Sequence, residues 1–94
     1  MQPTALTAAL GPAIWLASTE TLVVNLNTAE PDQLVALNYS LTDWAARIVA
    51  ERDNHGPYSS LIDLGQRVGL PVPITEKLDS MAAKAGMLGT YPRL

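Results

Sequence analysis

The feature that most constrains this chain is a pattern that occurs twice: a short apolar helix, a tight connection and a longer helix. The first copy spans residues 31–53 and the second spans residues 60–85. Apolar side chains recur in both at intervals of three and four residues, which places them on one face of each helix. No alternation that would predict a strand accompanies them. The pattern therefore predicts an all-α fold built from two helical hairpins.

The first hairpin has recognisable boundaries but an unusual connection. Thr28 or Glu30 can precede its first helix, and Pro31 suits the first turn, where a missing N–H costs little. The connection between the helices contains no glycine. Asn38 tolerates unusual backbone angles and Thr42 is a good N-cap residue. The sequence predicts that these two residues allow the turn to form.

The second hairpin is framed by glycine and proline. Residues 53–58, DNHGPY, end the preceding helix, and Ser60 with Asp63 resembles a capping box. Residues 68–73, VGLPVP, form the second tight connection, and Pro73 can open the last helix. The predicted core collects the apolar side chains that share the inner faces of both hairpins: Leu34, Leu37, Leu41, Ile48, Val49, Tyr58, Leu61, Leu64, Leu70, Ile74, Leu78 and Met81.

A length of 94 residues predicts one small domain with added ends. The apolar run at residues 5–18 is too short to span a membrane and is interrupted by Gly11 and Pro12. It is predicted to be an arm or helix packed on the domain, with the remnant of a targeting segment or a docking arm as alternatives. The predicted division is an apolar segment at 1–21, a helical domain at 22–86 and a tail at 87–94.

The composition argues against several kinds of chemistry. There is no cysteine, which excludes disulfides, thiolate metal sites and thiol catalysis. His55 is the only histidine, so no metal site or other cofactor is predicted. A serine nucleophile would need His55 beside Ser59 or Ser60, and both serines fit helix caps better. The chain is therefore predicted to be no enzyme and to have no small-molecule substrate.

The charge balance is acidic, with nine Asp and Glu against six Lys and Arg and a net charge of −3. Proteins that bind nucleic acid usually carry a basic excess, because neutralising phosphates supplies much of their affinity. A local basic patch would have to use the cations that the chain possesses: Arg47, Arg52, Arg67, Lys77, Lys84 and Arg93.

Two segments resemble a known family. Residues 24–29, VNLNTA, and residues 47–64, RIVAERDNHGPYSSLIDL, are similar to tandem helix-hairpin-helix domains of the ComEA type. The resemblance runs from Val24 to about Met81. It implies a compact all-α bundle, similar to SAM-type domains, with two consecutive helix-hairpin-helix units. The family includes DNA-binding proteins of competence and also PsbU, an extrinsic subunit of photosystem II without a DNA role, so the fold alone leaves the function open.

The resemblance also implies how such hairpins bind DNA. The family places a Gly-hydrophobic-Gly triplet between the helices, where bare backbone and the next helix N-terminus receive a phosphate. In the first hairpin the matching residues are Tyr39, Ser40 and Leu41, and in the second they are residues 69–71, Gly-Leu-Pro. Asp43 adds a negative charge where the phosphate would approach. These departures favour a protein partner over DNA.

The first hypothesis is therefore a non-catalytic protein-interaction or structural subunit. The resemblance offers PsbU as its precedent, which implies an extracytoplasmic or thylakoid-lumen location peripheral to a photosynthetic membrane complex. The candidate protein contacts are large apolar and aromatic side chains: Trp15, Tyr39, Leu41, Trp44 and Tyr91.

The alternative hypothesis is a ComEA-like protein that binds duplex DNA without sequence preference during DNA uptake. Its contacts would be backbone amides of the two turns, supported by nearby cations. The candidate residues are Ser40, Leu41, Thr42, Arg47, Gly69, Leu70 and Lys77.

Overall fold

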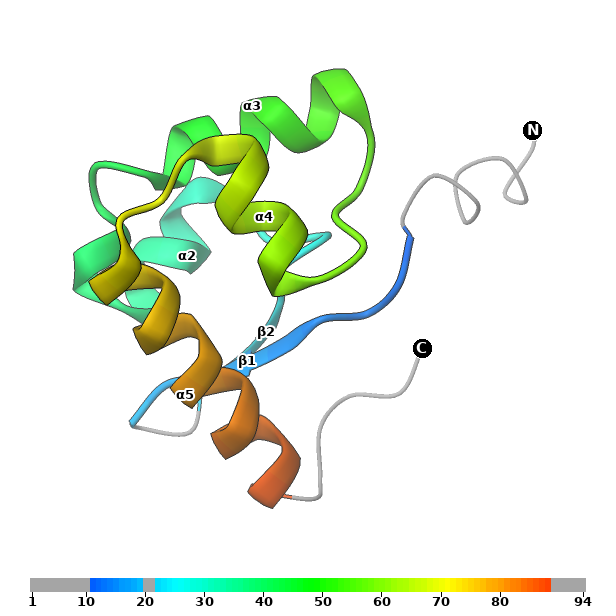
Figure 1. Ribbon diagram of the computed structural model, residues 1–94. Helices are drawn as coiled ribbons and strands as arrows, with labels where there is room; N and C mark the ends of the chain where they lie inside the picture. The colour runs from blue at the N-terminus through cyan, green and yellow to red at the C-terminus, as the bar shows by residue number, and fades with distance from the viewer. Residues whose placement is uncertain (1–10, 20–21, 89–94) are drawn as a thin grey trace.

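A computed structural model describes residues 11–19 and 22–88 and shows a mostly helical domain (Figure 1). The candidate contact Tyr91 and the cation Arg93 lie outside the described residues. The helices pair in sequence order as the two predicted hairpins. In order, the elements are β1 (Trp15–Ala17), β2 (Val23–Asn25), α2 (Pro31–Leu37), the 3-10 helix η1 (Tyr39–Leu41), α3 (Ala45–His55), α4 (Leu61–Val68) and α5 (Val72–Leu88).

A small antiparallel sheet corrects the all-α prediction. Strands β1 and β2 pair with Leu16 opposite Val24. Each strand has three residues, which is too short for an alternating pattern to be recognised in the sequence. The segment predicted as an apolar arm thus supplies one strand, and β1 lies against α5 (Figure 1).

The core lies between the two hairpins and the inner face of the sheet. Of the twelve predicted core residues, eight are buried, and the other four (Val49, Leu61, Leu70 and Ile74) pack partly buried against them. The prediction missed apolar residues from the strands and small residues from the helices. Those additional buried residues include Leu16, Val24, Leu26, Ala29, Ala45 and Val68.

A buried asparagine joins the strands to the connection between the hairpins. The Asn27 side chain accepts a hydrogen bond from the Tyr58 N–H and donates to the Tyr58 and Pro12 carbonyls. Each of these three bonds is 2.8 Å long. The Tyr58 hydroxyl donates to the Ile48 carbonyl at 2.8 Å. Tyr58 is fully buried, as predicted, and these bonds fix the position of the second hairpin relative to the first.

Candidate nucleic-acid interface

The first hairpin turn is a single turn of 3-10 helix capped by a side chain. Asn38 is extended, with φ −156° and ψ 121°, and its Oδ1 accepts the Ser40 N–H at 2.8 Å. The Thr42 hydroxyl donates to the Tyr39 carbonyl at 2.6 Å. Both residues thus help to form the turn, as predicted, but the predicted means were wrong. Asn38 acts through its side chain, and α3 begins after Trp44 without a side-chain cap.

The amides of this turn are engaged within the protein. In addition to the Ser40 N–H, the Leu41 N–H donates to the Asn38 carbonyl at 2.9 Å and the Thr42 N–H donates to the Tyr39 carbonyl at 3.1 Å. Ser40, Leu41 and Thr42 therefore do not present free amides to a phosphate, contrary to the DNA hypothesis. The Leu41 side chain is 1% exposed, so it also fails as a protein-contact candidate. It belongs to the core instead, which the sequence also predicted.

The second hairpin turn keeps its backbone bare. Gly69 ends α4 in the left-handed conformation, with φ 79° and ψ 39°. The N–H groups of Gly69 and Leu70 both donate to the Gly65 carbonyl, at 2.9 and 3.1 Å respectively. No atom lies within 4 Å of the position that a Gly69 Cβ would occupy. This turn is therefore sterically open, but its Gly69 and Leu70 amides are engaged within the protein, like those of the first turn.

The N-terminus of α5 has few amides to offer. The helix begins at Val72, one residue before the predicted Pro73. The Pro71 carbonyl accepts the N–H groups of Ile74 and Thr75, each at 3.1 Å. The two prolines carry no N–H. Within this first turn, the Val72 N–H is the donor that no described residue accepts.

The first hairpin turn meets helix α5 at one crevice. Ser40 and Leu41 from η1 line it together with Lys77 and Leu78 from α5. The structure thus brings Lys77 and Ser40 together, as the DNA hypothesis required. Arg47 stands instead over the ring of Trp44, with its Cζ 5.3 Å from the ring centre. Lys77 is therefore a cation of α5 that lies beside the first turn.

Two of the six cations stabilise the fold. Arg52 lies in the last turn of α3, and its Nη1 also donates to the Leu26 and Ala29 carbonyls at 3.0 and 2.8 Å. Arg67 donates to the Gly56 and Pro57 carbonyls at 2.6 and 3.0 Å. Their side chains are 11% and 20% exposed, so neither is available for a basic face.

Arg67 also stands at the centre of an ionic cluster. It contacts Glu51 and Asp63, each at 3.1 Å, and its Cζ lies 4.4 Å from the centre of the Tyr58 ring. The hydrogen bond from Arg67 lowers the pKa of Glu51. The Ser59 N–H, with further help from Arg67, lowers the pKa of Asp63. Burial raises the pKa of Tyr58 to about 12. The cluster holds α3 against α4.

The remaining candidates differ in exposure. Tyr39 is 82% exposed at the first turn, whereas Trp15 and Trp44 are half-buried. His55 lies at the exposed end of α3 with Nδ1 3.1 Å from Glu51. No group of three or more potential metal ligands occurs among the described residues. Among these side chains, Tyr39 is the most accessible to a partner.

Two polar side chains that organise the fold were not predicted from the sequence. Asn27 and Arg67 bind carbonyl groups that lie far away along the chain. A signal was nevertheless present, because Asn25 and Asn27 interrupt an otherwise apolar run. Polar residues at such positions are buried only when their hydrogen bonds are satisfied.

Comparison with known proteins gives one family and a small set of relatives. Residues 20–80 match the family model described as helix-hairpin-helix motif. Over 81 residues the chain is 37% identical to the error-prone DNA polymerases of Mycobacterium bovis and Mycobacterium tuberculosis. The alignment covers 86% of this chain but only 7% of each polymerase. No solved structure matches the chain. Within the part that the structure describes, no helix is long and apolar enough to cross a membrane.

Proposed function

Because this chain belongs to the helix-hairpin-helix family, we propose that it is a non-catalytic module that binds the DNA backbone through its second hairpin. The observation that carries the proposal is the exposed left-handed turn at Gly69, which no side chain covers. A phosphate that approaches this turn would reach the Val72 N–H at the start of α5. Lys77 lies five residues further along the same helix, about 1.4 turns away, and adds a positive charge.

Such binding would be weak and independent of sequence. The first turn uses its own amides internally and carries Asp43, so it adds little to phosphate binding. Among the residues that line the crevice between η1 and α5, Lys77 is the cation. A contact to one or two phosphates suits a module within a larger DNA-handling protein. The polymerase relatives, of which the chain covers 7%, are consistent with that setting.

The test is a titration of the protein against two labelled duplexes of unrelated sequence, at about 50 and 200 mM salt. We expect similar affinity for both duplexes and weaker binding at the higher salt concentration. Lys77→Gln should reduce the slope of log K against log salt by about one. Lys84→Gln, further along the same helix, is the matched control and should leave the slope unchanged. Absence of binding at the lower salt concentration would refute the proposal.

A second candidate function is protein docking through the first hairpin. The observation that favours it is Tyr39, which is 82% exposed at a turn whose amides are already engaged. Exposed tyrosines are common anchors in protein interfaces. The polymerase relatives give no support to a photosystem II partner. The test is photo-crosslinking from a probe at position 39, with a probe at the exposed Ala50 as the control. If this candidate is right, the probe at position 39 crosslinks to a partner protein and the probe at position 50 does not.

A further inference from the structure

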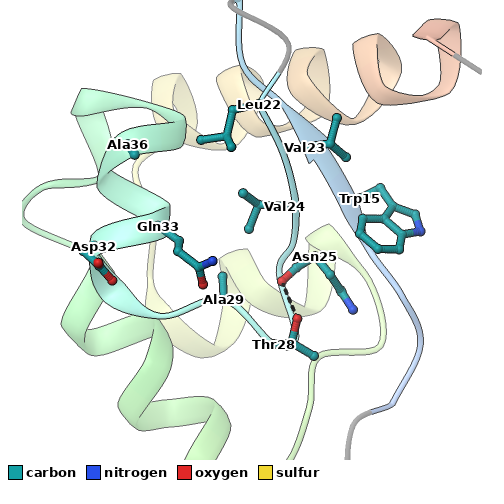
Figure 2. Close-up of a pocket in the computed structure, with 10 residues that line it drawn as sticks. All are labelled: Trp15, Leu22, Val23, Val24, Asn25, Thr28, Ala29, Asp32, Gln33 and Ala36. Carbon is teal, nitrogen blue, oxygen red and sulfur yellow. Dashed lines mark hydrogen bonds between the residues drawn. The ribbon is translucent and has the colours of Figure 1, made fainter. Parts of the chain in front are cut away.

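An open groove of about 410 Å³ lies between β2 and α2, away from both hairpin turns (Figure 2). Its lining includes four consecutive residues, 22–25, and Ala29, Gln33 and Ala36 from the α2 side. Figure 2 shows Leu22 and Val24 directed toward the α2 side of the strand, with Trp15 on the other side. The groove therefore runs along a strand edge and has side-chain walls on both sides.

The hydrogen-bond register shows which groups of β2 face this groove. Leu16 lies opposite Val24, and the Leu26 N–H donates to the Ile14 carbonyl at 2.9 Å, two residues further along. Hydrogen-bonded pairs recur at every second residue of an antiparallel ladder. Leu16 and Val24 therefore form a hydrogen-bonded pair, and Val23 directs its N–H and C=O away from β1.

Three main-chain groups on this outer edge have no partner among the described residues. They are the N–H and C=O of Val23 and the N–H of Asn25. The Asn25 carbonyl is already engaged, because it accepts the N–H groups of Thr28 and Ala29 at 3.0 Å. A donor, an acceptor and a second donor in a row are the groups that an added strand would bind.

We propose that this groove binds an extended segment of a partner protein, which adds to β2 as a third strand. The segment would carry apolar side chains at alternate positions, because successive side chains of a strand point to opposite walls. It would also carry a lysine or arginine, because the exposed carboxylate of Asp32 lines the groove and has no cation beside it among the described residues. This inference is independent of DNA binding.

A second copy of this chain fits the groove less well than such a segment. Pairing of two copies through their β2 edges would bring two Asp32 side chains to one interface. Neither β2 nor α2 contains a lysine or arginine to neutralise them. The charge of the groove therefore favours a basic partner over self-association.

The experiment uses the full chain and a blocked peptide, acetyl-Val-Thr-Val-Lys-Val-Thr-amide, followed by NMR. We expect the amide signals of Val23 and Asn25 to shift and to become protected from hydrogen exchange. The Gly69 and Val72 amides should not change. The controls are two versions of the peptide, N-methylated on the odd or on the even residues. One of them lacks the N–H donors that face β2 and should not bind, whereas the other keeps those donors. The proposal would be overturned if both methylated peptides bound as well as the parent peptide, or if the parent peptide failed to bind.

Two pairs of variants locate the peptide. Ala36→Trp fills the groove and should weaken binding at least tenfold, whereas Ala50→Trp places the same side chain on the exposed face of α3 and should not. Asp32→Asn should weaken binding of the lysine peptide severalfold but leave its norleucine analogue unaffected. Concentration-dependent dimerisation that Ala36→Trp abolishes, without peptide binding, would assign the groove to a second copy and overturn the proposal.

Discussion

At the scale of single residues, Arg67 joins α3, the connection that follows it and α4. Its guanidinium binds the carbonyls of Gly56 and Pro57, the carboxylates of Glu51 and Asp63, and the face of the Tyr58 ring. A planar group with several fixed donors satisfies such a set, whereas a lysine would satisfy only part of it. The residue therefore acts in stability and not in a basic surface.

Replacing Arg67 tests this structural role. Arg67→Gln should lower the free energy of unfolding by about 1.5–3 kcal/mol, because hydrogen bonds to charged groups contribute in that range. Urea unfolding followed by circular dichroism measures the change. Lys84→Gln is the control, and its effect should stay within about 0.5 kcal/mol. Equal effects of the two substitutions would contradict the role of Arg67.

Single residues differ in how far their roles could be predicted from the sequence. Tyr58 was correctly predicted as a core residue, because it follows Gly-Pro at the position where the resembling family has an aromatic residue. The roles of Asn27 and Arg67 could not be predicted, since their partners are carbonyls of residues 56–58 that only the tertiary fold brings near. Backbone acceptors are present at every residue and leave no trace in the sequence.

At the scale of elements, the two hairpin turns solve the same problem differently. The first lacks glycine and forms a 3-10 turn whose amide is capped by Asn38, while the second uses a left-handed Gly69. The sequence indicated both connections and their approximate positions. It did not indicate that Asn38 would act through its side chain, because asparagine is equally suited to a left-handed backbone and to a cap.

Two glycines of the second hairpin should respond to alanine with opposite signs. Gly69→Ala forces a Cβ into a left-handed residue and should cost about 1–2 kcal/mol, although space is available. Gly86→Ala lies in helical backbone with nothing nearby and should stabilise the protein by up to about 1 kcal/mol. Thermal unfolding of both variants gives the comparison. A stabilising Gly69→Ala would mean that the turn is not left-handed in solution.

The contact between α3 and α4 should weaken in acid. The folded chain lowers the pKa values of Glu51 and Asp63 below their ordinary values of 4.5 and 3.8. Their contribution to stability is therefore complete above those values and is lost as the pH falls through the lowered ones. The urea midpoint should fall steadily below about pH 4.5. In Arg67→Gln the part due to Glu51 should shrink, because His55 still lowers the pKa of Glu51, and Asp63 retains its bond from the Ser59 N–H at 3.0 Å.

At the scale of the whole molecule, the small sheet connects both ends of the described chain. Strand β1 pairs with β2, which leads into the first hairpin, and packs along α5 of the second (Figure 1). The sequence predicted the helices because their periodic faces are long enough to recognise. It did not predict the sheet, because three-residue strands depend on contacts with α5 rather than on a pattern of their own.

A substitution at Leu16 tests whether β1 is an integral part of the domain or a detachable arm. Leu16 is fully buried between the strands and the helical core. Leu16→Ala should lower the free energy of unfolding by about 2–5 kcal/mol, as for other large core residues. The readout is the helical circular dichroism signal, although the substitution lies in a strand. If β1 is integral, the whole helical transition shifts as one cooperative step. Leu22→Ala, at a leucine that is 42% exposed, should shift it far less. An unchanged helical transition in Leu16→Ala would mean that β1 detaches without loss of the helical core, and that the originally predicted arm is the better description.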